Sequence, residues 1–260
     1  MAQRFPIDPD DPRAPVQEQW DSMTEEQRAQ VVASLPADVP FELFMPEGDA
    51  HRLAKQRTLG ALGAFFDKIG RKVYLSSELG VYYPGEPRFA PDVLAVIDVE
   101  PHPRDKWVVS HEGKGLDLVI EVHVSGEWKK DFEANRKRYG RLGIPEYFLF
   151  DRTKDRLFGW RLPESTARVY EPIVPQLGRY TSSVLGLELG IEGEHLRFYF
   201  GTAPLPEAEE LVARLESMVG DLVQSRERDK EERERAEQER DAALRRVAEL
   251  EAELAKRRGG

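Results

Sequence analysis

The chain has 260 residues, of which 33 % are charged and 40 % hydrophobic, and it carries a formal net charge of −10. This length suffices for one packed domain of about 150–200 residues with extensions. The absence of cysteine excludes disulfides and thiolate metal sites and fits a cytoplasmic protein. No apolar run approaches the roughly 18 residues of a membrane span, so we expect a soluble protein without a membrane partner. The negative charge argues against a broad basic surface for nucleic acid, but not against a local basic groove.

The first stretch, residues 1–49, is punctuated by prolines, which limit it to short elements. Within it, the segment from Ser22 to Gln27 resembles a helix start with a capping box, and Val31, Val32 and Leu35 supply a modest apolar face. We therefore interpret residues 1–49 as a proline-rich N-terminal arm with a short helix.

Residues 50–203 carry the patterns of one packed domain. Apolar residues recur at helical spacing from about His51 to Lys68, and this helix should end near Gly70. Strand-like runs follow at 72–75, 80–83, 92–97 and 116–124, and then a polar helix at about 128–142. The apolar run 146–151 predicts a fully buried strand, and hairpin-like strands continue to about residue 200.

The tail, residues 204–260, has a different character. From Val212 to Leu254, residues three and four apart trace a heptad seam whose ends are apolar and whose middle is polar, as at Arg226, Asp229 and Arg233. One helix over this segment would span roughly 75–80 Å and would have nothing of its own to pack against. We favour a coiled coil that makes the protein a homo-oligomer over a single solvated helix.

Two carboxylates lie at the ends of neighbouring strand-like runs, Asp92 and Glu121. Mg²⁺ is usually held by one or two carboxylates together with waters and substrate phosphates. Side chains alternate along a strand, so Glu121 and His123 share one side, while the opposite side from Leu118 to Val124 is apolar and is the expected core face. Glu121 lies in an apolar run where an unpaired charge is costly, so a partner or an ion is expected. His123 is either a hydrogen-bonded imidazole near the surface or a catalytic group.

The strings Ala90-Pro-Asp-Val-Leu94, Leu118-Val-Ile-Glu-Val122 and Gly143-Ile-Pro-Glu-Tyr-Phe-Leu-Phe-Asp151, with Asp131 and Tyr139, carry a family resemblance. Over roughly residues 50–200 the chain resembles the Uma-type restriction endonuclease family, a branch of the PD-(D/E)XK nuclease superfamily. The resemblance implies a mixed α/β fold, with a restriction-endonuclease-like core, a mixed central sheet flanked by helices, and here a long C-terminal helix or coiled coil.

The resemblance also implies roles for individual residues. Asp92 and Glu121 match the two acidic ligands of a Mg²⁺ or Mn²⁺ ion, and the backbone carbonyl of Val122 matches a third. The ion would act as a Lewis acid and water activator at a phosphodiester bond. The implied activity is that of a metal-dependent endodeoxyribonuclease, with DNA as the substrate.

Two positions depart from the family pattern. The lysine that follows the acidic pair in the superfamily falls on His123, and its usual replacement on the next helix falls on Asn135. Lys137 lies two residues further, about 200° around the helix, and would point elsewhere. His123 could take the role of the base, because imidazole titrates near neutrality.

Further candidates surround this core set. Glu47, His51 and Glu78 are candidate extra ligands or water-positioning residues, with ordinary solvated side chains as the alternative. The best local patch for a phosphate backbone comprises Trp107, Trp128, Lys129, Lys130, Arg136, Lys137, Arg138 and Arg141. The alternative for this patch is a solvated helix face. Tyr139 and Tyr147 are expected to be packing residues.

Three functions follow from these patterns. The first is a metal-dependent endonuclease that uses Asp92, Glu121 and His123. The second is a catalytically inactive nuclease-like module for binding and oligomerisation, favoured by Asn135 and by the net charge of −10. The third is an unrelated acidic α/β protein in which Asp92 and Glu121 are structural.

Overall fold

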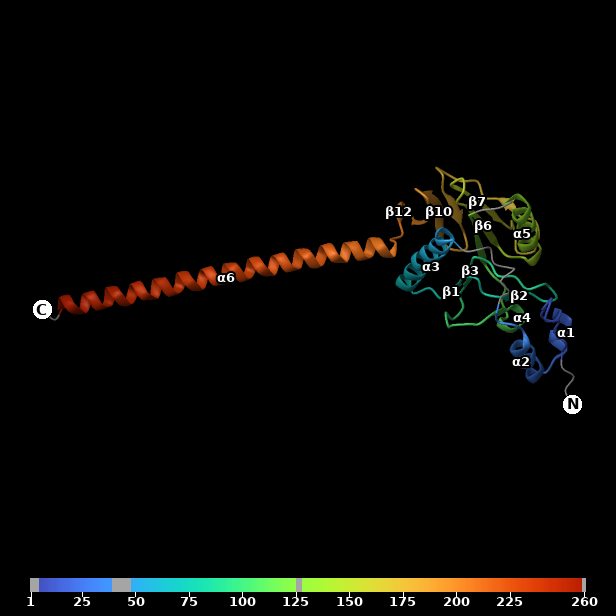
Figure 1. Cartoon of the computed structure of the whole chain (residues 1–260), viewed down its shortest axis with the longest axis horizontal. Coiled ribbons are helices and arrows are strands. Elements are labelled where there is room, and N and C mark those ends of the chain that lie inside the picture. The colour runs from blue at the N-terminus through green and yellow to red at the C-terminus, as the bar shows by residue number, and fades with distance from the viewer. Residues whose placement is uncertain (1–4, 39–47, 125–127, 259–260) are drawn as a thin grey trace. The chain divides into compact units, whose positions relative to one another are not determined.

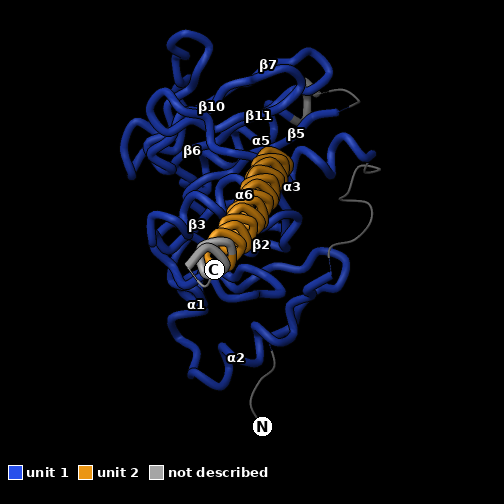
Figure 2. Tube along the Cα trace, turned by 90° about the vertical axis from the view of Figure 1, so that its left-hand side faces the viewer, with its two compact units in different colours: residues 1–207 blue, residues 208–260 orange. Residues whose placement is uncertain are grey.

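The structure is a computed structural model that describes residues 5–38, 48–124 and 128–258, with the side chains of 128–131 and 253–258 left out. The chain divides into two compact units, Met1–Glu207 and Ala208–Gly260, which are drawn in different colours in Figure 2. The first unit carries all the strands of the described residues, and the second is helical.

Two short helices open the first unit, α1 (Gln17–Ser22) and α2 (Glu25–Ser34). The predicted capping box of α2 is present: the Gln27 N–H donates to the Thr24 hydroxyl, and the Thr24 N–H donates to the Gln27 side chain. α1 was not expected from the sequence. Its buried Trp20 packs in one cluster with Val31 of α2 and with Tyr82.

The helix predicted near residues 51–68 is α3 (Asp49–Ile69), which ends at Gly70 in the left-handed conformation, with φ of 67°. Glycine adopts this conformation without the steric penalty that other residues meet. The buried residues of α3 form a stripe at helical spacing: His51, Lys55, Thr58, Ala61, Leu62 and Phe66. The helix therefore turns one face toward the sheet, in contact with β1, β3 and β5.

The central sheet has six strands in the order β1-β3-β5-β6-β7-β8. Their bounds are β1 Val73–Ser76, β3 Val93–Ile97, β5 Leu118–His123, β6 Glu146–Asp151, β7 Arg156–Arg161 and β8 Glu171–Pro172. Only β5 and β6 pair in parallel within this described sheet, and α5 (Trp128–Leu142) makes the crossover between them. The sheet is therefore mixed, with helices beside it, as Figure 1 shows. This confirms the predicted fold class.

Two smaller sheets complete the unit. β2 (Val81–Tyr82) pairs with β4 (Trp107–Val108), which leads into the short α4 (Val109–Glu112); β4 and α4 were not predicted. Of the hairpin strands expected to about residue 200, β7 and β8 join the central sheet, and the later ones form a four-stranded sheet in the order β12-β11-β10-β9. Their bounds are β9 Tyr180–Ser182, β10 Leu187–Glu192, β11 His195–Phe200 and β12 Ala203–Pro204.

β5 is buried on both of its faces. Leu118, Ile120 and Val122 lie in one core cluster with α3, and Val119 lies in a second cluster with Tyr139 of α5. The prediction that only the Leu118 side faces a core was therefore wrong, because β5 is a central strand with a helix on each side. β6 is buried along its whole length, as predicted.

The second unit consists of α6 (Ala208–Arg258), one continuous helix of 51 residues. The polar middle of the seam does not interrupt the helix. Within the part of the chain that the structure describes, no helix combines the length and apolar character needed to cross a membrane.

Packing around Gly159 of β7 gives a test of the core. A Cβ at this residue would lie 2.7 Å from Cε1 of Phe148 and 3.2 Å from Cδ1 of Tyr180. We expect Gly159→Ala to lower the free energy of unfolding by about 1–3 kcal/mol, measured by urea denaturation. The control is Gly60→Ala in α3, where a Cβ meets no atom within 4 Å. This substitution should raise the free energy of unfolding by about 0.5–1 kcal/mol. Equal effects of the two substitutions would contradict this packing.

Glu146 gives a test of buried charge. Its carboxylate accepts hydrogen bonds from the Ser182 hydroxyl and, at 2.7 Å, from the Ser183 N–H. Burial nevertheless raises the pKa of Glu146. The unfolded chain therefore releases this proton first, so stability falls as the pH rises from the unfolded pKa of about 4.3 through the folded pKa.

We expect Glu146→Gln to remove this loss. Relative to the unsubstituted chain, the variant should gain free energy of unfolding as the pH rises above about 4.3, measured by urea denaturation at each pH. Glu164→Gln, at an exposed residue, is the control and should show a difference that does not vary with pH. A pH-independent difference for Glu146→Gln as well would refute the buried-charge account.

Candidate active site

The pairing of β3 with β5 brings Asp92 and Glu121 together. Val93, the first residue of β3, lies opposite Ile120 in this antiparallel pair. Asp92 precedes Val93 and Glu121 follows Ile120, so the two acidic residues are neighbours. The Asp92 N–H donates to Oε2 of Glu121 at 3.4 Å, and the Val122 N–H donates to Oδ2 of Asp92 at 2.7 Å. The two carboxylates that the sequence singled out thus form one cluster.

The electrostatics of this cluster favour a positive charge or a proton between the carboxylates. Burial raises the pKa of Glu121 well above its usual range, and the nearby Asp92 carboxylate raises it further. A low-dielectric setting opposes ionisation of two adjacent acids at once. A divalent cation would remove this repulsion by the same Coulomb interaction.

Tyr139 of α5 holds the Glu121 side chain. Its hydroxyl donates to Oε1 of Glu121 at 2.5 Å, and the residue is only 2 % exposed. Burial and the Glu121 charge raise the pKa of Tyr139 well above its usual value, so the hydroxyl keeps its proton and remains a donor. We expected Tyr139 to be a packing residue; it does pack on Tyr147, but it also contacts a residue of the carboxylate cluster.

His51 approaches Asp92 from α3, whereas Tyr139 approaches Glu121 from α5. It lies in the first turn of α3, is buried, and places Nε2 3.0 Å from Oδ2 of Asp92. The structure therefore brings this candidate to the cluster. Because Asp92 also accepts from the Val122 N–H, its carboxylate is fixed by a strand and by a helix.

Glu78 and Lys55 lie beside the same strand entry. The Glu78 N–H donates to the carbonyl of Pro91, and the Glu78 carboxylate is 2.5 Å from Nζ of Lys55. Glu78 has a φ of 54°, in the left-handed region that residues with a side chain seldom adopt. This candidate is therefore an ion-paired residue next to the strand that carries Asp92.

Lys55 is a residue that the sequence interpretation missed. It is 3 % exposed and lies one helical turn after His51 on the buried stripe of α3. A lysine on the apolar stripe of an amphipathic helix is seldom buried without a charged partner. That pattern, a charge at a core position of the predicted helix, was the available signal.

The remaining candidates lie on β5 and α5. His123 ends β5 and is partly buried, beside Asp151 of β6 in the strand register. On α5, Asn135 is partly buried and Lys137 is exposed. Arg136 places its guanidinium 5.6 Å from the centre of the Phe132 ring. Glu47 lies outside the described residues, as do the side chains of Lys129 and Lys130.

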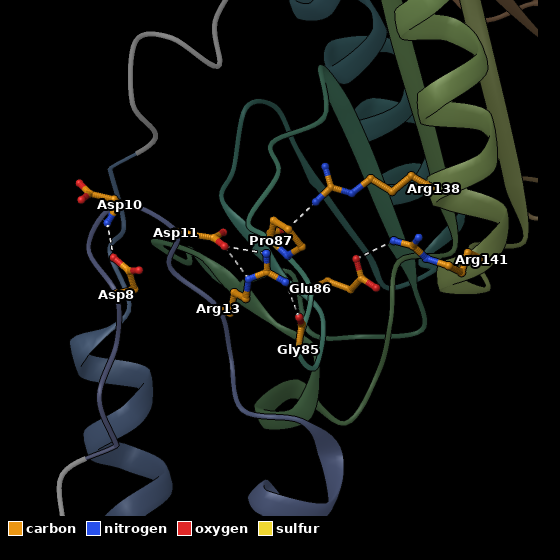
Figure 3. A network of polar contacts seen from close by, with 9 residues as sticks. All are labelled: Asp8, Asp10, Asp11, Arg13, Gly85, Glu86, Pro87, Arg138 and Arg141. Atoms are coloured by element: carbon orange, nitrogen blue, oxygen red, sulfur yellow. Dashed lines mark hydrogen bonds and ion pairs between the residues drawn. The ribbon is translucent and has the colours of Figure 1, made fainter.

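Part of the predicted phosphate-binding patch is engaged within the protein. Trp107 is fully buried, and its ring N–H donates to the carbonyl of Lys114, so its assignment to this patch was wrong. Arg138 donates to the carbonyl of Pro87, and Arg141 pairs with Glu86 at 2.7 Å, as Figure 3 shows. These two arginines attach α5 to the turn before β3.

The donor set suits a hard divalent ion. Among the described residues, no group of three His, Cys, Asp or Glu side chains gathers as a metal cluster. An ion here would be held by the carboxylates of Asp92 and Glu121 and by the carbonyl of Val122. Mg²⁺ is commonly bound by one or two carboxylates and keeps several waters, so this small set fits it.

Comparison with protein families places the chain. The family model Uma2, described as "Putative restriction endonuclease", matches residues 34–197, more than half of the chain. The chain belongs to the Uma2 family. The matched Uma2 region includes every strand of the central sheet and the whole carboxylate cluster.

A comparison with curated proteins found no match. Among solved structures, the chain is similar to a putative nuclease belonging to DUF820 from Anabaena variabilis ATCC 29413. The two are 16 % identical with a TM-score of 0.42, over 55 % of this chain and 77 % of the other.

Proposed function

We propose that this chain is a Mg²⁺- or Mn²⁺-dependent endonuclease that hydrolyses phosphodiester bonds of DNA. The observation that carries the proposal is the partly buried carboxylate pair of Asp92 and Glu121, hydrogen-bonded at the start of β3 in a chain of the Uma2 family. The pair is costly for the protein unless something compensates its charge. A divalent ion bound by the pair would compensate this charge and could in turn coordinate an oxygen of a phosphodiester.

The surrounding residues would fix the ligands in place. Asp92 is held by the Val122 N–H and by His51, and Glu121 is held by Tyr139. When bound, the ion would supply Lewis acidity and a water of lowered pKa. Partners that orient the ligands are commonly needed for metal affinity and activity.

His123 would accept the proton of the attacking water. It lies two residues after Glu121 on the same strand, so both side chains leave the same face about 6–7 Å apart. Arg136 and Lys137, with Lys129 and Lys130 near the start of α5, would add positive charge for the phosphate backbone. Their charge is local, which accommodates a net charge of −10 for the whole chain.

The first test separates metal binding from cleavage. We expect Mn²⁺ at about 100 times its Kd to stabilise the unsubstituted chain by about 2.7 kcal/mol, a Tm increase of roughly 5–10 °C. The same chain should cut DNA. Asp92→Asn and Glu121→Gln should lose the Tm increase and about 100-fold or more of the cleavage rate.

Glu133→Gln on the exposed face of α5 is the control and should behave as the unsubstituted chain. Cleavage that is equal in all four proteins would be contamination and would overturn the proposal. A Tm increase without cleavage of any DNA form would instead favour the inactive binding module.

The second test addresses His123. We expect His123→Ala to lower the cleavage rate by about 100-fold or more, since a general base contributes at least this much, and to keep the Mn²⁺-induced Tm increase. His102→Ala, at an exposed residue outside the cluster, is the matched control. An unchanged rate in His123→Ala with intact metal binding would remove His123 from the mechanism.

A further inference from the structure

α6 exposes apolar side chains in two separate stretches of its surface. Val212, Leu215, Val219 and Leu222 lie near its start, and Val247 and Leu250 lie near its end, all between 44 and 64 % exposed. Apolar rows of this kind at heptad spacing are typical of helices that pair with another helix. A second helix is therefore needed to cover these two rows.

The polar middle of the seam argues against a parallel pair of identical helices. In a parallel pair, each seam residue meets its own copy. Arg226, Arg233 and Arg240 would then make three arginine–arginine layers, and Asp229 would make an aspartate–aspartate layer. Like charges in direct contact inside a seam are strongly unfavourable.

An antiparallel pair of the same helices removes every one of these contacts. One register pairs the seam residues between Val219 and Leu250, and in each of these layers the two residue numbers add up to 469. The layers are Val219 with the partner's Leu250, Leu222 with the partner's Val247, Arg226 with the partner's Ala243, Asp229 with the partner's Arg240, and Arg233 with the partner's Ala236. The large apolar residues face each other, Arg240 faces an aspartate, and Arg226 and Arg233 each face a small alanine instead of another arginine.

Residues beside the seam support the same register independently. Val223 and Leu244 lie just outside the seam and are 50 % and 60 % exposed. The seam residues alone do not explain why apolar side chains occur at these two flanking positions. In this register Val223 lies beside the partner's Leu244. In the same flanking row, Lys230 lies beside the partner's Glu237, an attractive pair.

Two flanking pairs oppose the arrangement. Glu232 lies beside the partner's Glu239, and Glu216 lies beside the partner's Glu251. These side chains are exposed, so water and salt screen their repulsion. The layers of the seam, which are shielded from water in a pair, therefore determine the direction.

We propose that α6 pairs with the α6 of a second copy of this chain as an antiparallel two-stranded coiled coil, with Val219 opposite the partner's Leu250. The proposal goes beyond the nuclease function and does not depend on it.

The chain has no cysteine, so single engineered cysteines report on these contacts without background. We would mix Val219→Cys and Leu250→Cys full-length chains under reducing conditions, allow subunit exchange, oxidise mildly and analyse the products by non-reducing gel and mass spectrometry. We expect a disulfide-linked heterodimer in the mixture. Neither variant alone should give a disulfide-linked homodimer, because the two copies of residue 219 lie about 46 Å apart in this arrangement, as do the two copies of residue 250.

Val212→Cys mixed with Leu250→Cys is the matched control. It shifts the register by one heptad, about 10 Å, beyond the roughly 7 Å that a disulfide can bridge between Cα atoms. Light scattering on the unsubstituted chain should give a dimer. Covalent homodimers of each single variant would establish a parallel pair, and a monomer, a tetramer or crosslinking only in the register control would each overturn the proposal.

Discussion

The antiparallel pairing of β3 with β5 is the constraint on which the candidate active site depends. It places the entry of one strand beside the end of the other, so Asp92 and Glu121 meet although 29 residues separate them. The Asp92 N–H donates to the Glu121 carboxylate and the Val122 N–H donates to the Asp92 carboxylate, and these bonds hold the two carboxylates close enough to repel. A fold that pays this electrostatic cost in its interior needs a compensating ligand or proton.

The two helical layers each contribute one contact to this pair. α3 supplies His51 to Asp92, and α5 supplies Tyr139 to Glu121. Because these helices also carry the two cores on either side of β5, the geometry of the cluster follows from the packing of the whole unit. Residues such as Phe66 and Val119 therefore support the site through the packing of these cores.

The sequence predicted what depends on local pattern. The capping box of α2, the extent of α3 and the buried strand β6 follow from spacing alone, and Asp92 and Glu121 follow from charges at the ends of apolar runs. The sequence did not reveal contacts between distant segments. Burial of Trp107 against β2 and the ion pair of Lys55 with Glu78 arise only when separate elements pack. In the sequence alone, a tryptophan or lysine that is buried by a distant segment cannot be told from one that faces solvent.

The charged residues in the seam of α6 lower the stability of the helix pair but determine its orientation. Apolar residues in place of Arg226, Arg233 and Arg240 would pair more strongly, but they would allow parallel and antiparallel arrangements alike. Charges in the middle of the seam make one arrangement repulsive and leave the other intact. In the antiparallel pair the two copies of Ala208, where α6 begins, lie about 80 Å apart instead of side by side.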